Sequence, residues 1–463
     1  MMELSGKHVL VLGLGESGLA CARWCVRQGA GVRVADTRAA PPCLDELRHR
    51  VPGANFVAGE FTPALLAGID LVAVSPGLPG NLEVLRLARA AGTAVVGEIE
   101  LFAQALRGLG RPQVLAITGT NGKTTTTALT GHLLRATGKS VGIAGNISPA
   151  ALTALMDAQD ANTLPQIWVL ELSSFQLETT ETLNPTAATV LNISDDHLDR
   201  YAGLDAYVAA KFRIFQGATA VQVLNRDDPR VRRMALAGRR VISFGLGTPP
   251  VAADFGLRSK DGEAWLAQGE RCLLPLSELP LAGLHNAVNA MAALGLCASL
   301  GLDADVLLPA LRSFCGLPHR VEKIAELDGV TWYDDSKGTN VGATVAALAG
   351  LGGGVGRKAV VILGGDGKQQ DFSPLRDAVA SHGRAVVLIG RDAPVIESAI
   401  RSAGVAIERA TDMEQAVHQA QALARMGDAV LLSPACASFD MFRNYEHRAQ
   451  AFVAAVRSLE RKT

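Results

Sequence analysis

The chain has 463 residues, of which 48% are hydrophobic and 19% are charged. This length suits about two to four domains, and the composition is that of an ordinary globular protein rather than a disordered one. Because 44 basic and 45 acidic side chains give a net charge of −1, composition offers no reason to expect a nucleic acid or an anionic membrane as a partner.

Signals for secretion or membrane insertion are not expected either. The first ten residues lack the basic segment and apolar stretch of a secretion signal. The longest uncharged run, residues 279–302, contains His285 and two asparagines, and we expect a buried helix there rather than a membrane span. Since none of the seven cysteines belongs to a CxxC pair, we expect a reducing, cytoplasmic location without membrane insertion.

The first hundred residues alternate between strand-like and helix-like patterns. A helix is expected over residues 82–92, ending at Gly92. The strand candidates are residues 7–13, 31–36, 71–76 and 93–97. This alternation predicts a parallel sheet flanked by helices.

The first strand runs into GLGESG (residues 13–18), and the next strand ends at Asp36. A GxGxxG turn after a strand, followed by an acidic residue at the end of the next strand, matches the fingerprint of a dinucleotide-binding fold. In that fold the glycines let the backbone approach a pyrophosphate. The pattern by itself leaves an NAD-dependent oxidoreductase open.

A second alternating unit follows the glycine- and proline-containing stretch 107–113 and continues to about residue 316, with a strand-rich insertion near residues 241–276. Its first strand enters GTNGKT, which has the glycines, lysine and hydroxyl of a phosphate loop that binds nucleotide and magnesium. The chain departs from the strict P-loop pattern at one position, because that pattern has glycine where this chain has Ile117. The predicted phosphate-binding residues are Gly119, Thr120, Asn121, Gly122, Lys123, Thr124 and Thr125.

Polar residues follow the next two strands of this unit. Glu171 ends an apolar strand, and His197 follows another. Because ligands bind outside the carboxyl ends of parallel strands, the phosphate loop, Glu171 and His197 should meet in one crevice. An acid in this position is where nucleotide-bound magnesium is usually held.

A third α/β unit is expected after residues 314–322. Its strand candidates are residues 330–335, 358–365, 384–390 and 428–434. The predicted domains are therefore residues 1–102, 103–316 and 317–463.

Beyond these patterns, a series of motifs spread over the whole chain resembles the Mur ligase family. They are GTNGKTTT, ELSSFQLE, NISDDHLDRY, AAKFRIF, GLHNAVNA, GLPHRVE, DDSKGTN, GGDGKQQDF and SPACASFDMF, in this order. ELSSFQLE and SPACAS are similar, more narrowly, to members that add D-glutamate to UDP-N-acetylmuramoyl-L-alanine in peptidoglycan synthesis. The resemblance implies an α/β protein of three domains: a Rossmann-like UDP-binding domain, a central P-loop ATPase-type domain and a Rossmann-like C-terminal domain.

The resemblance also implies a monomeric, ATP-dependent ligase with particular site residues. GLGESG would then hold the UDP of the substrate without any nicotinamide. The residues implied for the UDP substrate are Gly15, Glu16, Ser17, Asp36, Thr37, Arg38, Ser75, Pro76, Gly77, Asn146 and His197. Those implied for the rest of ATP are Asn286, Asn289, Arg320 and Asp335.

For the metal, the resemblance implies two magnesium ions near Thr124, Glu171, His197 and a carbamylated Lys211. Lys123, Glu171, His197 and Lys211 would form the catalytic set. Lysine and hydroxyl donors suit the two carboxylates of D-glutamate. The residues implied for D-glutamate are Lys337, Thr339, Lys368, Ser438 and Tyr445, the last at a position where the family often has phenylalanine.

Several other functions compete with this hypothesis. An NAD-dependent oxidoreductase would explain GLGESG but not GTNGKT. A sister ligase for another amino acid, or a folylpolyglutamate synthase, would share GTNGKT; the UDP-type first domain disfavours the folate enzyme. A nucleotide-binding regulator without catalysis is disfavoured by the set of Lys123, Glu171, His197 and Lys211.

Overall fold

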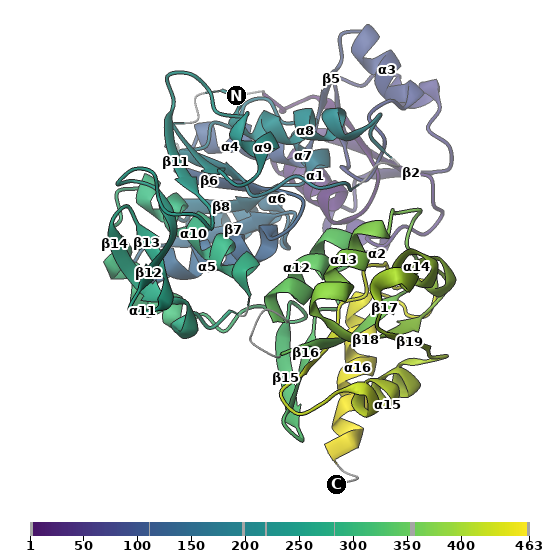
Figure 1. Cartoon of the computed structure of the whole chain (residues 1–463). Coiled ribbons are helices and arrows are strands. Elements are labelled where there is room, and N and C mark those ends of the chain that lie inside the picture. Colours follow the sequence, from purple (N-terminus) through teal and green to yellow (C-terminus); the bar gives the residue numbers. More distant parts are fainter. Residues whose placement is uncertain are drawn as a thin grey trace. The chain divides into compact units, whose positions relative to one another are not determined.

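The computed structural model describes residues 3–110, 112–196, 200–217, 220–281, 283–351 and 357–460. Its strands form separate sheets of five, nine and six strands, each accompanied by helices (Figure 1). The three α/β regions predicted from the sequence are therefore confirmed. In the described ranges, the helices are all too short or too polar to cross a lipid bilayer.

The first sheet is parallel and has the strand order β3-β2-β1-β4-β5. Alternate residues of β1 enter different cores, because Val9 and Val11 pack in one apolar cluster while Leu10 and Leu12 pack in another. Burial on both faces explains the continuous apolar run. The strands are β1 (His8–Leu12), β2 (Gly31–Asp36), β3 (Asn55–Ala58), β4 (Leu71–Val74) and β5 (Ala94–Val96). The helices are α1 (Glu16–Arg27), α2 (Leu44–Arg50), the 3-10 turn η1 (Pro63–Leu66), α3 (Glu83–Ala90) and α4 (Glu98–Arg107).

The second sheet has the order β14-β13-β12-β11-β10-β9-β6-β8-β7. Its strands β6 to β11 are parallel to their neighbours among these six. The strand-rich insertion predicted near residues 241–276 corresponds to β11 through β14. The strands are β6 (Gln113–Thr118), β7 (Val141–Gly145), β8 (Ile167–Glu171), β9 (Ala187–Val190), β10 (Val221–Asn225), β11 (Arg240–Phe244), β12 (Phe255–Lys260), β13 (Glu263–Gln268) and β14 (Arg271–Pro275).

Helices of this region connect the strands. The run predicted as a buried helix over residues 279–302 forms α10, which begins later, at Leu284. The helices are α5 (Lys123–Ala136), α6 (Ala151–Asp160), α7 (Ser174–Leu177), α8 (Leu204–Phe212), η2 (Arg213–Phe215), α9 (Pro229–Arg232), η3 (Leu276–Glu278), α10 (Leu284–Ser299) and α11 (Ala304–Ser313).

The third sheet has the order β15-β16-β20-β17-β18-β19, with only β15 antiparallel to its neighbour among the described strands. Val361 and Leu363 of β17 enter one core, and Val360 and Ile362 enter the core on the other face. The strands are β15 (Glu322–Leu327), β16 (Val330–Asp334), β17 (Ala359–Gly364), β18 (Gly383–Ile389), β19 (Ala406–Arg409) and β20 (Ala429–Leu432). The helices are α12 (Val341–Leu351), α13 (Ser373–His382), α14 (Ala393–Ile400), η4 (Arg401–Ala403), α15 (Met413–Leu423) and α16 (Tyr445–Glu460).

Tertiary contacts group the chain into two compact units. One contains residues 1–260, 265–273 and 291–311, and the other contains the remaining short segments and residues 312–463. The first unit therefore holds the first sheet together with most of the second. The exact domain boundaries predicted from the sequence stay predictions; α4 runs across the one placed at residue 102.

Candidate active site

The phosphate loop lies between β6 and α5, as the sequence predicts. Gly122 precedes the helix with φ of +82°, a left-handed conformation that glycine adopts without strain. The Lys123 ammonium donates to the carbonyl oxygens of Gly119 and Thr120, each at 2.9 Å. The lysine side chain thus folds back on its own loop.

A residue that sequence reasoning missed holds this loop in place. The backbone N–H of Asn121 donates to Asn192 Oδ1 at 2.8 Å, and Asn192 Nδ2 donates to the Asn121 carbonyl at 3.1 Å. The N–H of Thr120 also donates to the Asn192 carbonyl, at 2.9 Å. Asn192 lies two residues after the end of β9, which is a neighbour of β6 in the sheet. Its position at the carboxyl end of a parallel strand was the signal that could have found it.

Lys211, on α8, reaches the same loop from the other side. It is 1% exposed, and its ammonium donates to the Gly119 carbonyl at 2.9 Å and to Thr118 Oγ1 at 3.4 Å. Burial lowers the pKa of Lys211 well below its ordinary value, and the positive charge of Lys123 lowers it further; Asp196 and Glu171 act in the opposite direction. A buried lysine of this kind is readily neutral.

Glu171 ends β8 with its carboxylate buried. It is 2% exposed; Oε1 accepts from Asn146 Nδ2 at 2.7 Å, whereas Oε2 has no hydrogen-bond partner among the described residues. Gly145 must be glycine, because a Cβ there would lie 2.2 Å from the Glu171 carbonyl oxygen. A buried carboxylate oxygen without a partner is a suitable ligand for a hard cation.

The structure thus brings Lys123, Lys211 and Glu171 to the carboxyl ends of neighbouring strands. Thr124, in the first turn of α5, is also buried there. These residues are suited to bind magnesium, because Glu171 offers a carboxylate oxygen that has no hydrogen-bond partner among the described residues. His197 lies outside the described residues, so its predicted place in this group stays a prediction.

The GLGESG loop of the first sheet is tied to Asp36. This side chain is 2% exposed; Oδ2 accepts from the Leu14 N–H at 2.7 Å and from the Arg38 guanidinium at 2.8 Å. The hydrogen bond from Arg38 lowers the pKa of Asp36 to about 2. Gly18 cannot carry a side chain, because a Cβ would lie 1.9 Å from the Gly13 carbonyl oxygen. The loop has the close helix–strand packing of a phosphate-binding turn.

Other residues predicted for the UDP substrate lie around these strand ends. The Ser75 N–H donates to the Leu12 carbonyl at 2.9 Å, which joins the turn after β4 to β1. Glu16 instead accepts hydrogen bonds at Oε1 from Ser148 Oγ and the Ala150 N–H, each at 2.9 Å. The Glu16 side chain therefore fixes the loop before α6, which sequence reasoning did not anticipate.

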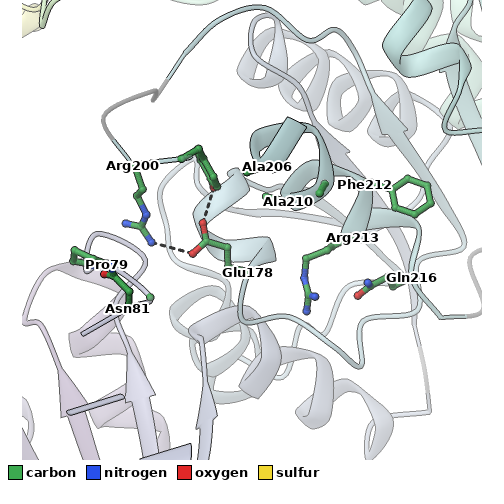
Figure 2. A pocket seen from close by; sticks show the side chains of 12 residues that line it. Pro79, Asn81, Glu178, Arg200, Ala206, Ala210, Phe212, Arg213 and Gln216 are labelled. Carbon is green, nitrogen blue, oxygen red and sulfur yellow. Dashed lines mark hydrogen bonds and ion pairs between the residues drawn. The ribbon is translucent and has the colours of Figure 1, made fainter. Parts of the chain in front are cut away.

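A pocket of about 650 Å³ lies beside α8 (Figure 2). At its wall Glu178 accepts from Tyr201 at 2.6 Å and pairs with Arg200 at 3.2 Å. Arg200 also donates to the Pro76 carbonyl at 2.8 Å. None of the described residues predicted for substrate, nucleotide or metal binding lines this pocket. Arg200 connects the pocket to the predicted UDP-binding turn through its hydrogen bond to Pro76.

In the C-terminal domain, four of the five residues predicted for D-glutamate lie on loops that leave β16, β17 and β20. These strands are neighbours in the sheet, so their carboxyl ends meet at one edge. The Ala435 N–H donates to the Gly338 carbonyl at 3.0 Å, and Asp366 and Ala437 exchange two backbone hydrogen bonds of 2.9 Å. Lys337, Thr339, Lys368 and Ser438 are therefore carried by loops that contact each other.

Several of these loop residues have a left-handed backbone. Lys368, Gln369 and Ala435 have φ of +48°, +62° and +57°. Non-glycine residues in this region are strained and often occur at binding sites. Tyr445, in the first turn of α16, faces the Lys337 ammonium with its ring at 5.1 Å, which supplies a contact that does not need a phenol.

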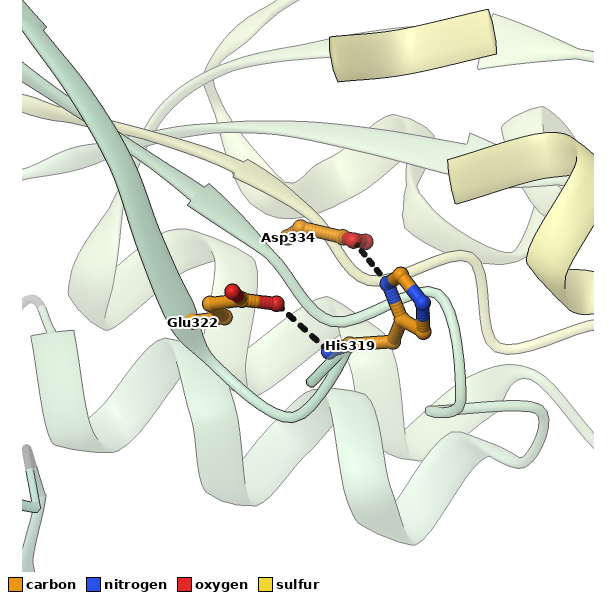
Figure 3. A group of neighbouring side chains, drawn as sticks. All are labelled: His319, Glu322 and Asp334. Atoms are coloured by element: carbon orange, nitrogen blue, oxygen red, sulfur yellow. Dashed lines mark hydrogen bonds and ion pairs between the residues drawn. The ribbon is translucent and has the colours of Figure 1, made fainter. Parts of the chain in front are cut away.

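Next to these loops, His319, Glu322 and Asp334 form a close group (Figure 3). His319 Nδ1 lies 2.7 Å from Asp334 Oδ2, and Glu322 Oε2 accepts from the His319 N–H at 2.8 Å. Asp334 Oδ1 accepts from the Ser336 N–H and hydroxyl at 2.9 and 2.6 Å. Hydrogen bonds thus engage Glu322 Oε2 and both Asp334 carboxylate oxygens, and Asp334 orients the His319 ring.

The remaining residues predicted for ATP lie in the second compact unit. Asp335 is buried and accepts from Ser433 Oγ at 2.6 Å; burial raises its pKa to about 7, although Ser433 and Arg320 act in the opposite direction. Asn289 Nδ2 donates to Asn286 Oδ1 at 3.2 Å on one face of α10, as their spacing of three predicts.

Three α/β sheets, with a phosphate loop at the strand ends of the second, define a P-loop nucleotide-binding protein of several domains. Family models match the chain in three successive parts: the Mur ligase MurD-like, N-terminal domain at residues 7–97, the Mur ligase middle domain at 117–297, and the Mur ligase, glutamate ligase domain at 319–436. The chain belongs to the Mur ligase family. The N-terminal match includes the GLGESG turn.

Individual relatives agree with this assignment. A UDP-N-acetylmuramoylalanine–D-glutamate ligase of Aromatoleum aromaticum is 60% identical over 466 residues, which cover 99% of both chains. Another, of Nitrosospira multiformis, is 56% identical over 462 residues, covering 99% of this chain and 97% of its own.

Solved structures show the same fold at low sequence identity. MurF from Acinetobacter baumannii is 19% identical with a TM-score of 0.62, covering 98% of this chain and 92% of that chain. UDP-N-acetylmuramate-alanine ligase MurC from Thermotoga maritima is 20% identical with a TM-score of 0.58, covering 97% and 99%.

Proposed function

We propose that this chain joins D-glutamate to UDP-N-acetylmuramoyl-L-alanine with ATP, producing ADP and phosphate, in peptidoglycan precursor synthesis. The observation that carries the proposal is the 60% identity to a D-glutamate ligase over 99% of both chains. The partly buried Lys123 and the buried Lys211 and Glu171 support a nucleotide-dependent reaction at this fold.

The chemistry follows from the poor reactivity of a carboxylate. A carboxylate oxygen of the alanyl group attacks the terminal phosphorus of ATP, and ADP leaves. The amine of D-glutamate then attacks the acyl phosphate carbon, loses a proton, and phosphate departs as the amide forms. Because charge develops on the transferring phosphoryl group, the protein contributes mainly positioning and electrostatic stabilisation.

In this proposal Lys123 leaves the Gly119 and Thr120 carbonyls to contact the outer phosphates of ATP. In this proposal the N–H groups of Gly119 and Gly122 and the start of α5 face the same phosphates. The nucleoside part of ATP is assigned to Asn286, Asn289, Arg320 and Asp335, and the UDP part of the other substrate to the loops around GLGESG and Asp36.

Thr124, Glu171, His197 and Lys211 would hold magnesium in the proposed enzyme, with two ions expected. When bound, magnesium neutralises charge on the phosphates. Lys211 takes part as a carbamate: its amine forms a bond to the carbon of CO2, loses a proton and becomes an anion. The lowered pKa of Lys211 supports this step, because only a neutral amine attacks CO2.

The carbamate can be tested directly. Protein exchanged into 13C-bicarbonate should show one carbamate carbon resonance, and the Lys211→Arg variant should lack it. Lys260→Ala, which removes an exposed lysine stacked on Trp265, is the matched control and should keep the resonance. An identical spectrum for the wild type and Lys211→Arg would contradict the carbamate.

For D-glutamate, the proposal assigns its two carboxylates to the donors Lys337, Thr339, Lys368 and Ser438, with Tyr445 packing beside Lys337. The proposal also keeps the monomeric state and cytoplasmic location expected from the sequence.

The decisive experiment measures phosphate release with ATP, magnesium and UDP-N-acetylmuramoyl-L-alanine while single amino acids are added. Release that depends on D-glutamate is the expected result. Release with L-glutamate, L-alanine or a diamino acid instead would identify a sister ligase. No release from folded protein that binds ATP would overturn the ligase, and a nicotinamide fluorescence titration would then test the oxidoreductase.

A further inference from the structure

Arg448 is a buried arginine that bonds only to backbone carbonyl groups among the described residues. It lies in the first turn of α16 and is 1% exposed. Its guanidinium donates to the Ser336 carbonyl at 2.8 Å and to the Cys436 carbonyl at 3.1 Å. Nε is buried without a hydrogen-bond partner in the described chain.

The two carbonyl groups belong to the loops that carry the proposed D-glutamate donors. Ser336 directly precedes Lys337, in the loop after β16. Cys436 lies two residues before Ser438, in the loop after β20. Since β16 and β20 pair in parallel, a single side chain that spans their carboxyl ends fixes the separation of the two loops.

The electrostatic surroundings show that this placement is costly. Burial lowers the pKa of Arg448 to about 10, whereas Cys436, Asp440, Asp334 and Asp335 favour its charged form. Burying a charge whose hydrogen bonds are to neutral carbonyls costs desolvation energy, so stability alone does not explain an arginine here. The planar fork of an arginine, however, can bond two acceptors in fixed directions.

The same helix turn also places a second side chain at the site. Tyr445, three residues before Arg448, presents its ring to the Lys337 ammonium at 5.1 Å. Residues three apart lie on the same side of a helix. The first turn of α16 therefore contacts the Lys337 loop at the side chain of Lys337 and at the carbonyl just before it.

We propose that Arg448 is a positioning residue of the amino-acid site: by bridging Ser336 and Cys436 it sets the spacing of Lys337 and Ser438. This inference rests on the proposed D-glutamate function of those two residues. Arg448 does not touch the amino acid itself. A displacement of about 1 Å in a positioned group can cost on the order of a hundredfold in rate, so an error in this spacing has a measurable effect.

The test compares Arg448→Lys and Arg448→Met with Arg384→Lys and Arg384→Met. Arg384 is the matched control because it lies in the same sheet and forms a partly buried pair with Asp428 at 2.8 Å. That pair lies at the amino end of β18 and β20, away from the site loops. For all variants, thermal unfolding gives the melting temperature, and phosphate release gives the KM for each substrate.

We expect both Arg448 variants to raise KM for D-glutamate by roughly tenfold or more, while KM for UDP-N-acetylmuramoyl-L-alanine stays within about twofold. The Arg384 variants should lower the melting temperature without changing either KM, since unfolding reduces the amount of active enzyme and not its affinity. Arg448→Lys keeps the charge and most of the volume, so it remains informative if Arg448→Met does not fold.

Arg448 variants that lose stability like the Arg384 variants but keep KM for D-glutamate would overturn the inference. A wild-type protein that turns over with a different amino acid would instead refute the proposed substrate. In that case the same comparison, made with the amino acid that is used, still decides whether Arg448 positions its site.

Discussion

The ammonium groups of Lys123 and Lys211 both donate to the Gly119 carbonyl oxygen. In the proposed function Lys123 contacts the outer phosphates of ATP, so replacing it removes a donor to the transferring phosphoryl group. We expect Lys123→Ala to lower turnover by roughly a hundredfold or more. Phosphate release measures this, with the exposed Lys260→Ala as control. Turnover near the wild-type value would contradict the assigned role of the loop.

Glu98 is a second residue whose charge has a predictable effect. It begins α4, is 1% exposed, and accepts from the Leu152 N–H at 2.5 Å. Burial raises the pKa of Glu98 from 4.5 to about 7, and the neighbouring Glu16 raises it further. Ionisation therefore costs more in the folded than in the unfolded state. The contribution of protonated Glu98 to the free energy of unfolding is fully present below about pH 4.5, and it is lost as the pH rises through about 7.

Glu98→Gln removes this ionisation. When the pH is raised from about 5 to about 8, the free energy of unfolding of the variant should therefore rise relative to that of the wild type by up to about 3 kcal/mol. Thermal unfolding at the two pH values measures the change. Glu83→Gln is the control, because Glu83 is exposed and paired with Arg86. A Glu98→Gln difference that is the same at both pH values would show that Glu98 does not titrate as described.

At the scale of elements, an aromatic contact joins α4 to β8. Phe102 and Trp168 are 0% and 1% exposed, and their rings meet edge to face at 5.1 Å. Phe102→Ala should reduce the free energy of unfolding by about 3–5 kcal/mol, as expected for a large cavity. Urea denaturation measures this, with the exposed Val251→Ala as control. A loss below about 1 kcal/mol would mean that the site relaxes around the missing ring.

The elements that the sequence predicted share strong local patterns. β6, the phosphate loop and α5 combine an apolar run, glycines and a helical face of Leu129, Leu133 and Leu134, all 0% exposed. Strands such as β3 and β19 escaped prediction because they are four residues long, lie at sheet edges and are only partly buried. Their strand state comes from pairing with a neighbour, which local sequence does not encode.

The site was predictable where chemistry and spacing coincide, as for Lys123 and Glu171. The roles of Asn192, Glu16 and Arg448 could not be predicted, because each depends on carbonyl or N–H groups supplied by a distant part of the chain. Lys211 was an ordinary helix lysine in the sequence except for the family resemblance. Its burial against Gly119 is a tertiary property.

At the scale of the whole molecule, the phosphate loop belongs to one compact unit and the D-glutamate loops to the other. The proposed reaction needs ATP and D-glutamate in one active site, so we expect the units to close when the substrates bind. Small-angle scattering should show a smaller radius of gyration with an ATP analogue, UDP-N-acetylmuramoyl-L-alanine and D-glutamate than with the protein alone. D-glutamate alone is the control. Unchanged profiles with all ligands would exclude a large closure.

The loops at the carboxyl ends of β16, β17 and β20 also have a practical consequence. Together with the first turn of α16, they place every residue assigned to D-glutamate between positions 337 and 445. Under the proposed assignment, amine selectivity is encoded by one contiguous segment that extends through Arg448, while nucleotide activation is encoded upstream. A chimera that exchanges this segment intact, Arg448 included, is a more rational route to a new amino-acid specificity than scattered point substitutions.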